Sequence, residues 1–261
     1  MKRLFVLIYS IFSYILFLFT FSYLIGFTAN FIVPKGIDGP LSNGLLEAIS
    51  VNFGLILLFG VQHSIMARQW FKKRLTQIIP TAAERSTFVL FSSLALLILF
   101  LAWQPIGGTI WIIKEPSLII LCWLLFCLGY GLVLWSSFQI NHFDLFGLRQ
   151  AWLYFRSKPY TELPFKTPFL YRYVRHPLYL GLLMAFWATP IMSYTRLLFA
   201  LLFTLYVLRA IRWEESDLVQ VFGEKYRKYK TRVPMILPWP FRQSRNGKEP
   251  VYKAIAKRRQ E

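Results

Sequence analysis

Residues 4–26, LFVLIYSIFSYILFLFTFSYLIG, run for 23 residues without a charged side chain. An α-helix of that length rises about 34 Å, enough to cross the roughly 30 Å hydrocarbon core of a bilayer. The whole chain has the same character, since 56% of its 261 residues are hydrophobic, 18% are aromatic and the mean hydropathy is +0.46. These values exclude an ordinary soluble domain and indicate a membrane protein.

The basic residues Lys2 and Arg3 in front of this run are also typical of a secretory signal peptide. The apolar run is longer than a signal peptide needs, and no small-residue cleavage site ends it. We therefore expect a retained transmembrane helix.

Further apolar runs predict an all-α, polytopic transmembrane bundle of about six helices. The predicted spans cover residues 4–26, 45–66, 87–103, 117–138, 177–193 and 196–211. The last two are short and nearly contiguous, so we expect a tight helical hairpin, with both segments crossing, followed by an amphipathic cytoplasmic C-terminal helix. Residues 1–240 form one predicted domain, and residues 241–261 a basic, flexible tail.

Basic residues predict the orientation, because they accumulate on the cytoplasmic side of membrane proteins. With the N-terminus inside, 27 of the 30 Lys and Arg residues lie in cytoplasmic segments. The opposite side holds Lys35, Lys114 and Arg196. We expect a multi-pass inner-membrane protein with both termini and the active site cytoplasmic.

The net charge of +18 is concentrated in these loops and the tail, which favours anionic lipid headgroups over nucleic acid as the partner. No feature points to an obligate protein partner. Cys122 and Cys127 lie five apart in one predicted helix, so they point about 140° away from each other. With only three histidines in the chain, we expect no metal site.

Polar residues gather in four clusters at the cytoplasmic helix ends, and the first is YRYVRHPLYLG, residues 171–181. Pro177 suits a first helical turn and holds His176 in an extended conformation. The helix N-terminus beside Arg175 suits a carboxylate or phosphate. Gly181 leaves room for another helix or a ligand. The alternative is a basic anchor at the membrane surface with His176 as a cap.

The second cluster follows the last span, as RWEESDLVQVFGEKYRKY, residues 212–229. If the helix continues, one face carries a carboxylate among apolar and aromatic side chains: Glu215, Leu218, Phe222, Tyr226 and Tyr229. Such a face suits a cationic ligand such as a sulfonium. An interfacial amphipathic helix explains it equally well.

The third cluster is NHFDLFGLR, residues 141–149, in which Asn141, His142 and Asp144 supply a general base, orient a substrate or build a turn. The fourth combines Gln62-His63-Ser64 and Arg68 with Glu84-Arg85-Ser86. His63 lies within an apolar run and needs a partner, which a structural role also explains. Glu84 or Ser86 can cap the next helix.

The first two clusters together resemble a known superfamily. Arg175-His176-Pro177-Leu178-Tyr179-Leu180-Gly181, then Glu214-Glu215 and Phe222-Gly223-x-x-Tyr226-x-x-Tyr229, are similar to the isoprenylcysteine carboxyl methyltransferases and phospholipid N-methyltransferases. The other two clusters, at residues 62–68, 84–86 and 141–149, resemble the bacterial methanethiol S-methyltransferases, which make dimethyl sulfide. This second resemblance extends over nearly the whole chain.

The resemblance implies S-adenosyl-L-methionine as cofactor. It implies a pocket lined by Arg175, His176, Tyr179, Gly181, Glu214 and Glu215, with Tyr226 and Tyr229 over the adenosine. Physically, the helix N-terminus and Arg175 would receive the methionine carboxylate, and a glutamate would suit the ribose hydroxyls or the amino group. The chain has no glycine-rich Rossmann loop.

With methanethiol as acceptor, the reaction is an in-line displacement by thiolate sulfur, so the thiol must lose its proton. His142 with Asp144, or His63, is the predicted base. Arg68 or Arg85 would stabilise the anion, and Asn141 would contact the substrate.

Two alternatives remain at this point. One is a methyltransferase for a larger lipidic acceptor, either an isoprenylated thiol or carboxylate or a phospholipid amine. The other is a non-enzymatic carrier or scaffold. A carrier usually shows internal repeats or polar residues at the midplane, whereas here the polar residues collect at one face.

Overall fold

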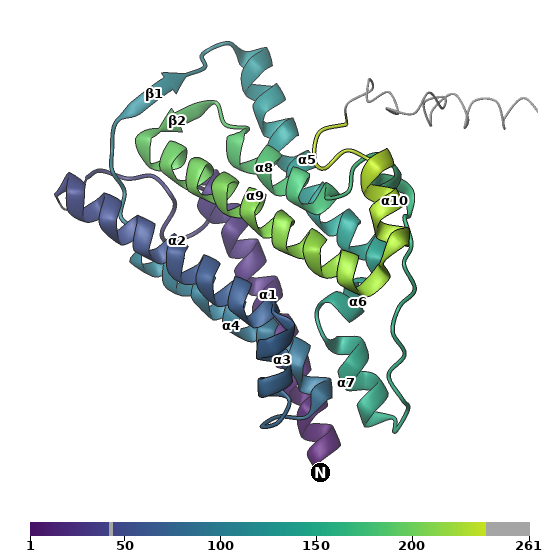
Figure 1. The fold of residues 1–261 in the computed structure, drawn as a ribbon. Helices are drawn as coiled ribbons and strands as arrows, with labels where there is room; N and C mark the ends of the chain where they lie inside the picture. Colours follow the sequence, from purple (N-terminus) through teal and green to yellow (C-terminus); the bar gives the residue numbers. More distant parts are fainter. Residues whose placement is uncertain (42–43, 239–261) are drawn as a thin grey trace, which may run out of the picture.

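The computed structural model describes residues 1–41 and 44–238 (Figure 1). Within them, five helices are long and apolar enough to cross a membrane, which confirms the predicted helical bundle. These helices are α1 (Lys2–Ala29), α2 (Leu45–Ala67), α4 (Thr81–Ala102), α5 (Pro116–Ile140) and α9 (Tyr194–Phe222). The predicted tail over residues 241–261 lies outside the described residues.

Shorter elements join the long helices, mostly at one end of the bundle. The short helices are α3 (Gln69–Leu75), α6 (His142–Leu145), α7 (Leu148–Phe155), α8 (Pro177–Trp187) and α10 (Glu224–Arg232), with one 3₁₀ turn at Phe169–Arg172. The two strands, β1 (Thr109–Ile112) and β2 (Ile191–Ser193), pair antiparallel.

The predicted fifth span is shorter than expected. A helix over residues 177–193 was predicted, but α8 has 11 residues and ends at Trp187. Pro190 follows shortly, and because proline lacks a backbone N–H the chain continues as an extended segment into β2. An 11-residue helix rises about 16 Å, roughly half the hydrocarbon core. The extended segment covers the remaining distance to β1, which follows the far end of α4.

The helices α5 and α8 touch through their backbones. A Cβ atom added at Gly129 would lie 2.6 Å from the carbonyl oxygen of Gly181, and one at Gly181 would lie 2.5 Å from that of Gly129. Of the two uses predicted for the space at Gly181, the structure therefore shows helix packing. Gly181, predicted to line the cofactor pocket, is buried against α5 instead.

Replacing Gly129 with alanine is expected to destabilise the protein by about 1–3 kcal/mol, since the new methyl group would overlap backbone atoms that cannot move independently. Thermal unfolding in detergent, followed by circular dichroism, measures the change. Gly131→Ala is the matched control, because a Cβ at Gly131 meets nothing within 4 Å. A Gly129→Ala protein that melts at or above the wild-type temperature would contradict this packing.

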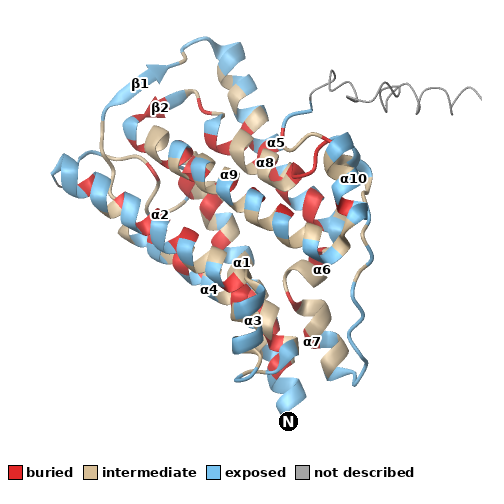
Figure 2. Ribbon diagram, in the orientation of Figure 1, coloured by how far each residue is buried: buried red, intermediate tan, exposed pale blue. Residues whose placement is uncertain are grey.

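Aromatic side chains fill the interior, and apolar side chains also cover much of the outside. The largest fully buried rings are Trp103, Phe27, Phe100 and Phe199, contributed by α1, α9 and the end of α4. Figure 2 shows exposed positions along the outer faces of the long helices. On α1 these exposed positions include Phe5, Ile8, Phe12, Ile15 and Phe19. An apolar outer surface suits lipid rather than water.

Arg196 begins α9 at the end of the bundle opposite the four clusters. It pairs with Asp38, and its Nη1 donates a 2.6 Å hydrogen bond to the carbonyl oxygen of Thr28. Ser193 caps the helix by accepting from the Arg196 backbone N–H at 2.9 Å. These partners satisfy a charge that would otherwise be costly near membrane depth.

Two contacts join three of the four polar clusters at the other end of the bundle. Arg85 on α4 donates from Nε to the carbonyl oxygen of Leu145 on α6, at 2.6 Å. Arg68, after α2, pairs with Asp217 on α9 at 3.1 Å. Clusters separated by up to 150 positions in sequence therefore share one face of the molecule.

Candidate active site

The turn before α8 carries Arg175 and His176. Pro177 occupies the first helical position, and His176 is non-helical at φ −126° and ψ 64°, as its place before a proline predicts. The backbone N–H groups of Arg175 and His176 donate to the carbonyl oxygens of Pro234 (2.9 Å) and Met235 (3.1 Å). The segment after α10 is thus held against the start of α8.

Arg175 and Glu215 form a buried ion pair. Nε of Arg175 lies 2.6 Å from Oε1 of Glu215, and both side chains are less than a tenth exposed. Nη1 of Arg175 also donates to the carbonyl oxygens of Lys230 (3.0 Å) and Val233 (2.5 Å). The guanidinium therefore joins α8, α9 and α10, and has little capacity left for the methionine carboxylate that the sequence assigned to it.

Glu215 is equally occupied. Besides its contact with Arg175, Glu215 has Oε1 at 3.2 Å from Nε2 of His176 and Oε2 at 2.9 Å from the amine of Lys230. The sequence analysis left open which glutamate would bind the ribose hydroxyls or the amino group, and Glu215 already has three protein partners. Lys230 completes this network and escaped the sequence analysis, because one lysine in a basic helix carries no distinguishing signal.

Glu214, the neighbouring carboxylate, is accessible. Its side chain is 44% exposed, and Oε2 lies 3.8 Å from Nδ1 of His176. The Tyr179 hydroxyl lies beside the same carboxylate, and the rings of His176 and Tyr179 are 5.7 Å apart. Arg85 is also within electrostatic range of Glu214. Three side chains therefore surround one accessible carboxylate, two of them from the first cluster and one from the fourth.

Tyr226 and Tyr229 lie together on α10, as predicted, but not on a continuation of α9. The chain turns at Gly223, whose φ of +56° is a conformation that glycine adopts easily, so the predicted single helix is broken there. Phe165, from the preceding loop, joins the group and contacts Tyr226 and Tyr229 at ring distances of 5.8 and 5.5 Å. Nothing periodic in the loop sequence indicated this role for Phe165.

The two tyrosines differ in exposure and bonding. Tyr226 is 2% exposed, and burial raises the pKa of its hydroxyl. The hydroxyl of Tyr229 donates to the carbonyl oxygen of Tyr171. Both tyrosine hydroxyls lie within electrostatic range of Arg175 and Glu215.

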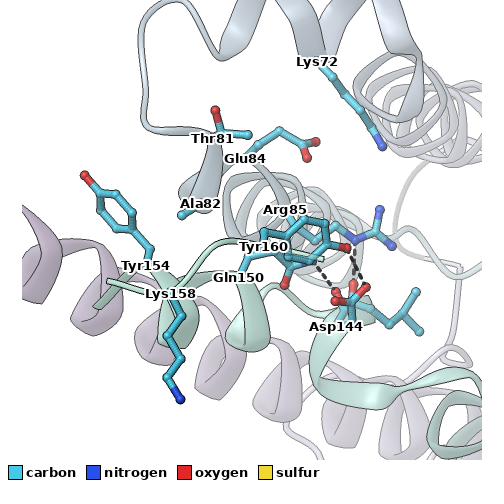
Figure 3. A pocket seen from close by; sticks show the side chains of 11 residues that line it. Lys72, Thr81, Ala82, Glu84, Arg85, Asp144, Gln150, Tyr154, Lys158 and Tyr160 are labelled. Atoms are coloured by element: carbon cyan, nitrogen blue, oxygen red, sulfur yellow. Dashed lines mark hydrogen bonds between the residues drawn. The ribbon is translucent and has the colours of Figure 1, made fainter. Parts of the chain in front are cut away.

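A cavity of about 440 Å³ lies beside these residues (Figure 3). It brings together parts of the third and fourth clusters with residues that the sequence analysis did not assign. Its lining is Lys72 of α3; Thr81, Ala82, Glu84 and Arg85 of α4; Asp144 and Leu145 of α6; Gln150 and Tyr154 of α7; and Lys158 and Tyr160. Lys72, Gln150 and Tyr160 stand in segments whose composition is that of an ordinary basic loop.

Arg85 connects the cavity with Glu214. Its Nε is bonded to Leu145, and its guanidinium lies 4.8 Å from the centre of the Phe88 ring. The carboxylates of Glu84, Asp144 and Glu214 all lie within electrostatic range of this guanidinium. Among the described residues it has no other hydrogen bond, so its terminal nitrogens remain available to an anion.

The third cluster is divided by the structure. Asp144 faces the cavity, where it pairs with Arg149 at 2.7 Å and accepts from the Tyr160 hydroxyl at 3.3 Å. Asn141 is turned to the backbone, and its side-chain oxygen accepts from the Asp144 N–H at 3.2 Å. This is the turn-building alternative for Asn141, and it places that side chain in a helix cap.

His142 is buried between α1 and α5, away from Asp144. Its Nε2 lies 2.8 Å from the Tyr14 hydroxyl and its Nδ1 lies 2.7 Å from Oγ of Ser137. The ring stacks on Phe138, 4.2 Å away. Burial lowers the pKa of His142, and both ring nitrogens are already hydrogen-bonded. The predicted pair of His142 and Asp144 is not assembled.

His63 has one hydrogen bond, from Nδ1 to Ser92 Oγ at 3.0 Å. Its ring contacts Phe88 at 4.7 Å, the same ring that Arg85 covers. Nε2 has no hydrogen-bond partner in the part of the chain that the structure describes. Arg68 is engaged with Asp217 and with the ring of Trp213, 5.9 Å away, so of the two predicted anion-binding arginines Arg85 is the less constrained.

Several known proteins are similar in sequence to most of this chain. Residues 117–225 match the family model described as phospholipid methyltransferase. The chain is 51% identical to a methanethiol S-methyltransferase of Crocosphaera subtropica, over 92% of this chain and 94% of that protein. It is 48% identical to a methanethiol S-methyltransferase of Mycobacterium tuberculosis, over 93% and 99%. Methanethiol S-methyltransferase 1 of Bradyrhizobium diazoefficiens is 47% identical, over 89% and 81%. No solved structure matches the chain.

Proposed function

Since the chain belongs to the methanethiol S-methyltransferase family, we propose that it transfers a methyl group from S-adenosyl-L-methionine to the sulfur of methanethiol, forming dimethyl sulfide. That the protein is a methyltransferase in a membrane follows from these relatives and from its five apolar helices. The thiol acceptor, the cofactor and the roles of individual residues are the content of the proposal.

The observation that carries it is the accessible Glu214 carboxylate with His176, Tyr179 and Arg85 around it. When bound, the cofactor supplies a methyl group on a cationic sulfonium. A carboxylate beside aromatic and imidazole rings suits such a cation. Arg85 carries the opposite charge and suits a thiolate. The described residues therefore offer one site for each reacting partner.

Methyl transfer forms a bond from the acceptor sulfur to the methyl carbon and breaks the bond from that carbon to the sulfonium sulfur. The acceptor must lose its thiol proton first, because the thiolate is the nucleophile. Of the predicted bases, His63 keeps an unbonded Nε2 among the described residues, whereas both nitrogens of His142 are occupied. This difference favours His63 as the proton acceptor and leaves His142 as a structural residue.

A site at the edge of the bilayer suits the charges of the reaction. Thiolate and sulfonium neutralise each other as the methyl group moves, so a dry pocket that aligns them favours the transition state over the separated ions. Phe88, 7% exposed, and the partly buried Tyr179 provide apolar surroundings between Arg85 and Glu214.

The same end of the bundle faces the cytoplasm in our proposal. Arg3, Arg68, Arg85 and Arg175 all lie there, and basic residues favour the cytoplasmic side. Both termini, the active site and the basic loops would then meet cytoplasmic solutes and anionic headgroups.

The test supplies methanethiol and S-adenosylmethionine to membranes containing the protein and measures dimethyl sulfide in the headspace by gas chromatography. Wild type is expected to form product, and His176→Ala to lose it. Lys114→Ala, at the opposite end of the bundle, is the control that should retain full turnover. If the protein binds the cofactor, forms no dimethyl sulfide and transfers labelled methyl groups to phospholipid, the acceptor is a lipid amine and not methanethiol.

A further inference from the structure

The cavity at α3, α4, α6 and α7 contains charges that the fold does not neutralise. Of its two carboxylates, Asp144 is paired with Arg149, while Glu84 forms no ion pair with any described residue. Lys72 likewise has no ion pair there, and Arg85 uses only Nε. Figure 3 shows the Lys72 amine, the Glu84 carboxylate and the Arg85 guanidinium directed toward a common space.

Two buried acceptors in the same cavity have no donor. Oε1 of Glu84 and Oε1 of Gln150 are buried and lack a hydrogen-bond partner among the described residues. Leaving a buried acceptor unsatisfied is unfavourable, so two in one cavity point to a ligand that carries N–H or O–H groups. The amide of Gln150 is oriented by its own bond to the Asp144 carbonyl oxygen, 3.0 Å from Nε2.

The cations of the cavity call for an anionic group on the same ligand. Burial lowers the pKa of Lys72, against the opposing effect of Glu84. A partly desolvated amine beside a guanidinium is stabilised when a carboxylate lies between them. The required ligand thus has donors at one place and an anion a few atoms away.

Methanethiol does not meet this requirement. It has two non-hydrogen atoms and no charge before deprotonation, whereas the cavity measures about 440 Å³ and presents both signs of charge. Something larger and zwitterionic fits the lining.

We propose that this cavity binds an α-amino acid group, with its carboxylate on Arg85 and Lys72 and its ammonium on Glu84 and Gln150. Two molecules carry this chemistry, namely the methionyl end of the methyl donor and a free amino acid. The first source rests on the proposed function, and the second does not. Because Arg85 lies within electrostatic range of both Glu214 and Tyr179, a ligand held here adjoins the site of methyl transfer.

The test measures binding to the purified protein in detergent for three probes. S-adenosylhomocysteine has the amino acid group and the nucleoside, 5′-methylthioadenosine has the nucleoside alone, and L-methionine has the amino acid alone. The variants are Glu84→Gln and Lys72→Met. Their matched controls are Glu162→Gln and Lys73→Met, which change exposed residues outside the cavity lining. Thermal unfolding confirms that each variant is folded.

Each cavity variant is expected to weaken the binding of S-adenosylhomocysteine about tenfold or more, because one charge-assisted contact is lost. The affinity for 5′-methylthioadenosine should not change. That result assigns the cavity to the methionyl end. If the variants weaken binding of L-methionine and leave binding of S-adenosylhomocysteine unchanged, the cavity is assigned to a free amino acid. The proposal is wrong if the variants change the affinity for none of the probes. It is also wrong if they weaken binding of 5′-methylthioadenosine as much as binding of S-adenosylhomocysteine. Dimethyl sulfide formation by wild type is scored separately, so failure of the proposed acceptor leaves this binding result intact.

Discussion

Replacing Arg175 with methionine is expected to destabilise the protein by about 3–5 kcal/mol, because Glu215 would keep a buried negative charge without its closest partner. The carbonyl oxygens of Lys230 and Val233 would also lose their donor. Thermal or chemical unfolding in detergent measures the loss. The effect is large because one buried guanidinium holds groups of α8, α9 and α10 together.

The double variant Arg175→Met, Glu215→Met is the control for this prediction. Since the uncompensated charge is then removed as well, the double variant should be more stable than Arg175→Met alone, and the two changes should not add. A different outcome would contradict the structural role: Arg175→Met that unfolds like wild type but no longer binds S-adenosylhomocysteine would restore Arg175 as the carboxylate ligand predicted from sequence.

Glu214→Gln is expected to lower kcat/KM for methyl transfer by about 100-fold with little change in unfolding temperature. The substitution keeps the shape of the side chain and removes the negative charge that faces the sulfonium in the proposed site. Because Glu214 is 44% exposed and its one ion pair among the described residues is the 3.8 Å contact with His176, its loss should scarcely affect the fold. Headspace dimethyl sulfide over a range of cofactor concentrations separates kcat from KM.

Glu224→Gln provides the matched control for that experiment. Glu224 is also a glutamate at a helix boundary, but its side chain is 68% exposed and pairs with Arg227 on the surface. It should retain wild-type turnover. Glu214→Gln with more than half of wild-type activity would remove Glu214 from the catalytic site.

The relation of Arg175 to Glu215 shows where sequence reasoning stops. Both residues were predicted to line the cofactor pocket, and the structure places them against each other as a buried ion pair. They stand 40 positions apart, and no pattern in the chain indicates that they bind each other rather than a ligand. Pair geometry depends on how α8, α9 and α10 pack. The roles of Arg175 and Glu215 consequently differ from those expected.

The cavity gives a second example of the same limit. Its lining comes from five separate stretches between Lys72 and Tyr160, and Glu84 was assigned at most a capping role. Packing of α4 against α6 and α7, which includes the contact of Arg85 with Leu145, places these residues around one space. His142 illustrates the reverse case, since its residue type suggests catalysis while its neighbours Tyr14 and Ser137 hold it as a structural group.

The sequence by itself determined the membrane bundle, five of the six predicted spans, the start of α8 at Pro177 and the family, because hydrophobic run length, proline and short motifs act locally. Tertiary structure decided how α8 ends, since Pro190 and the pairing with β1 end it together, and where α9 turns at Gly223. It also decided which charges are neutralised within the fold and which remain available to a ligand. That division depends on the distances between charged side-chain atoms of different helices, which the order of residues along the chain does not specify.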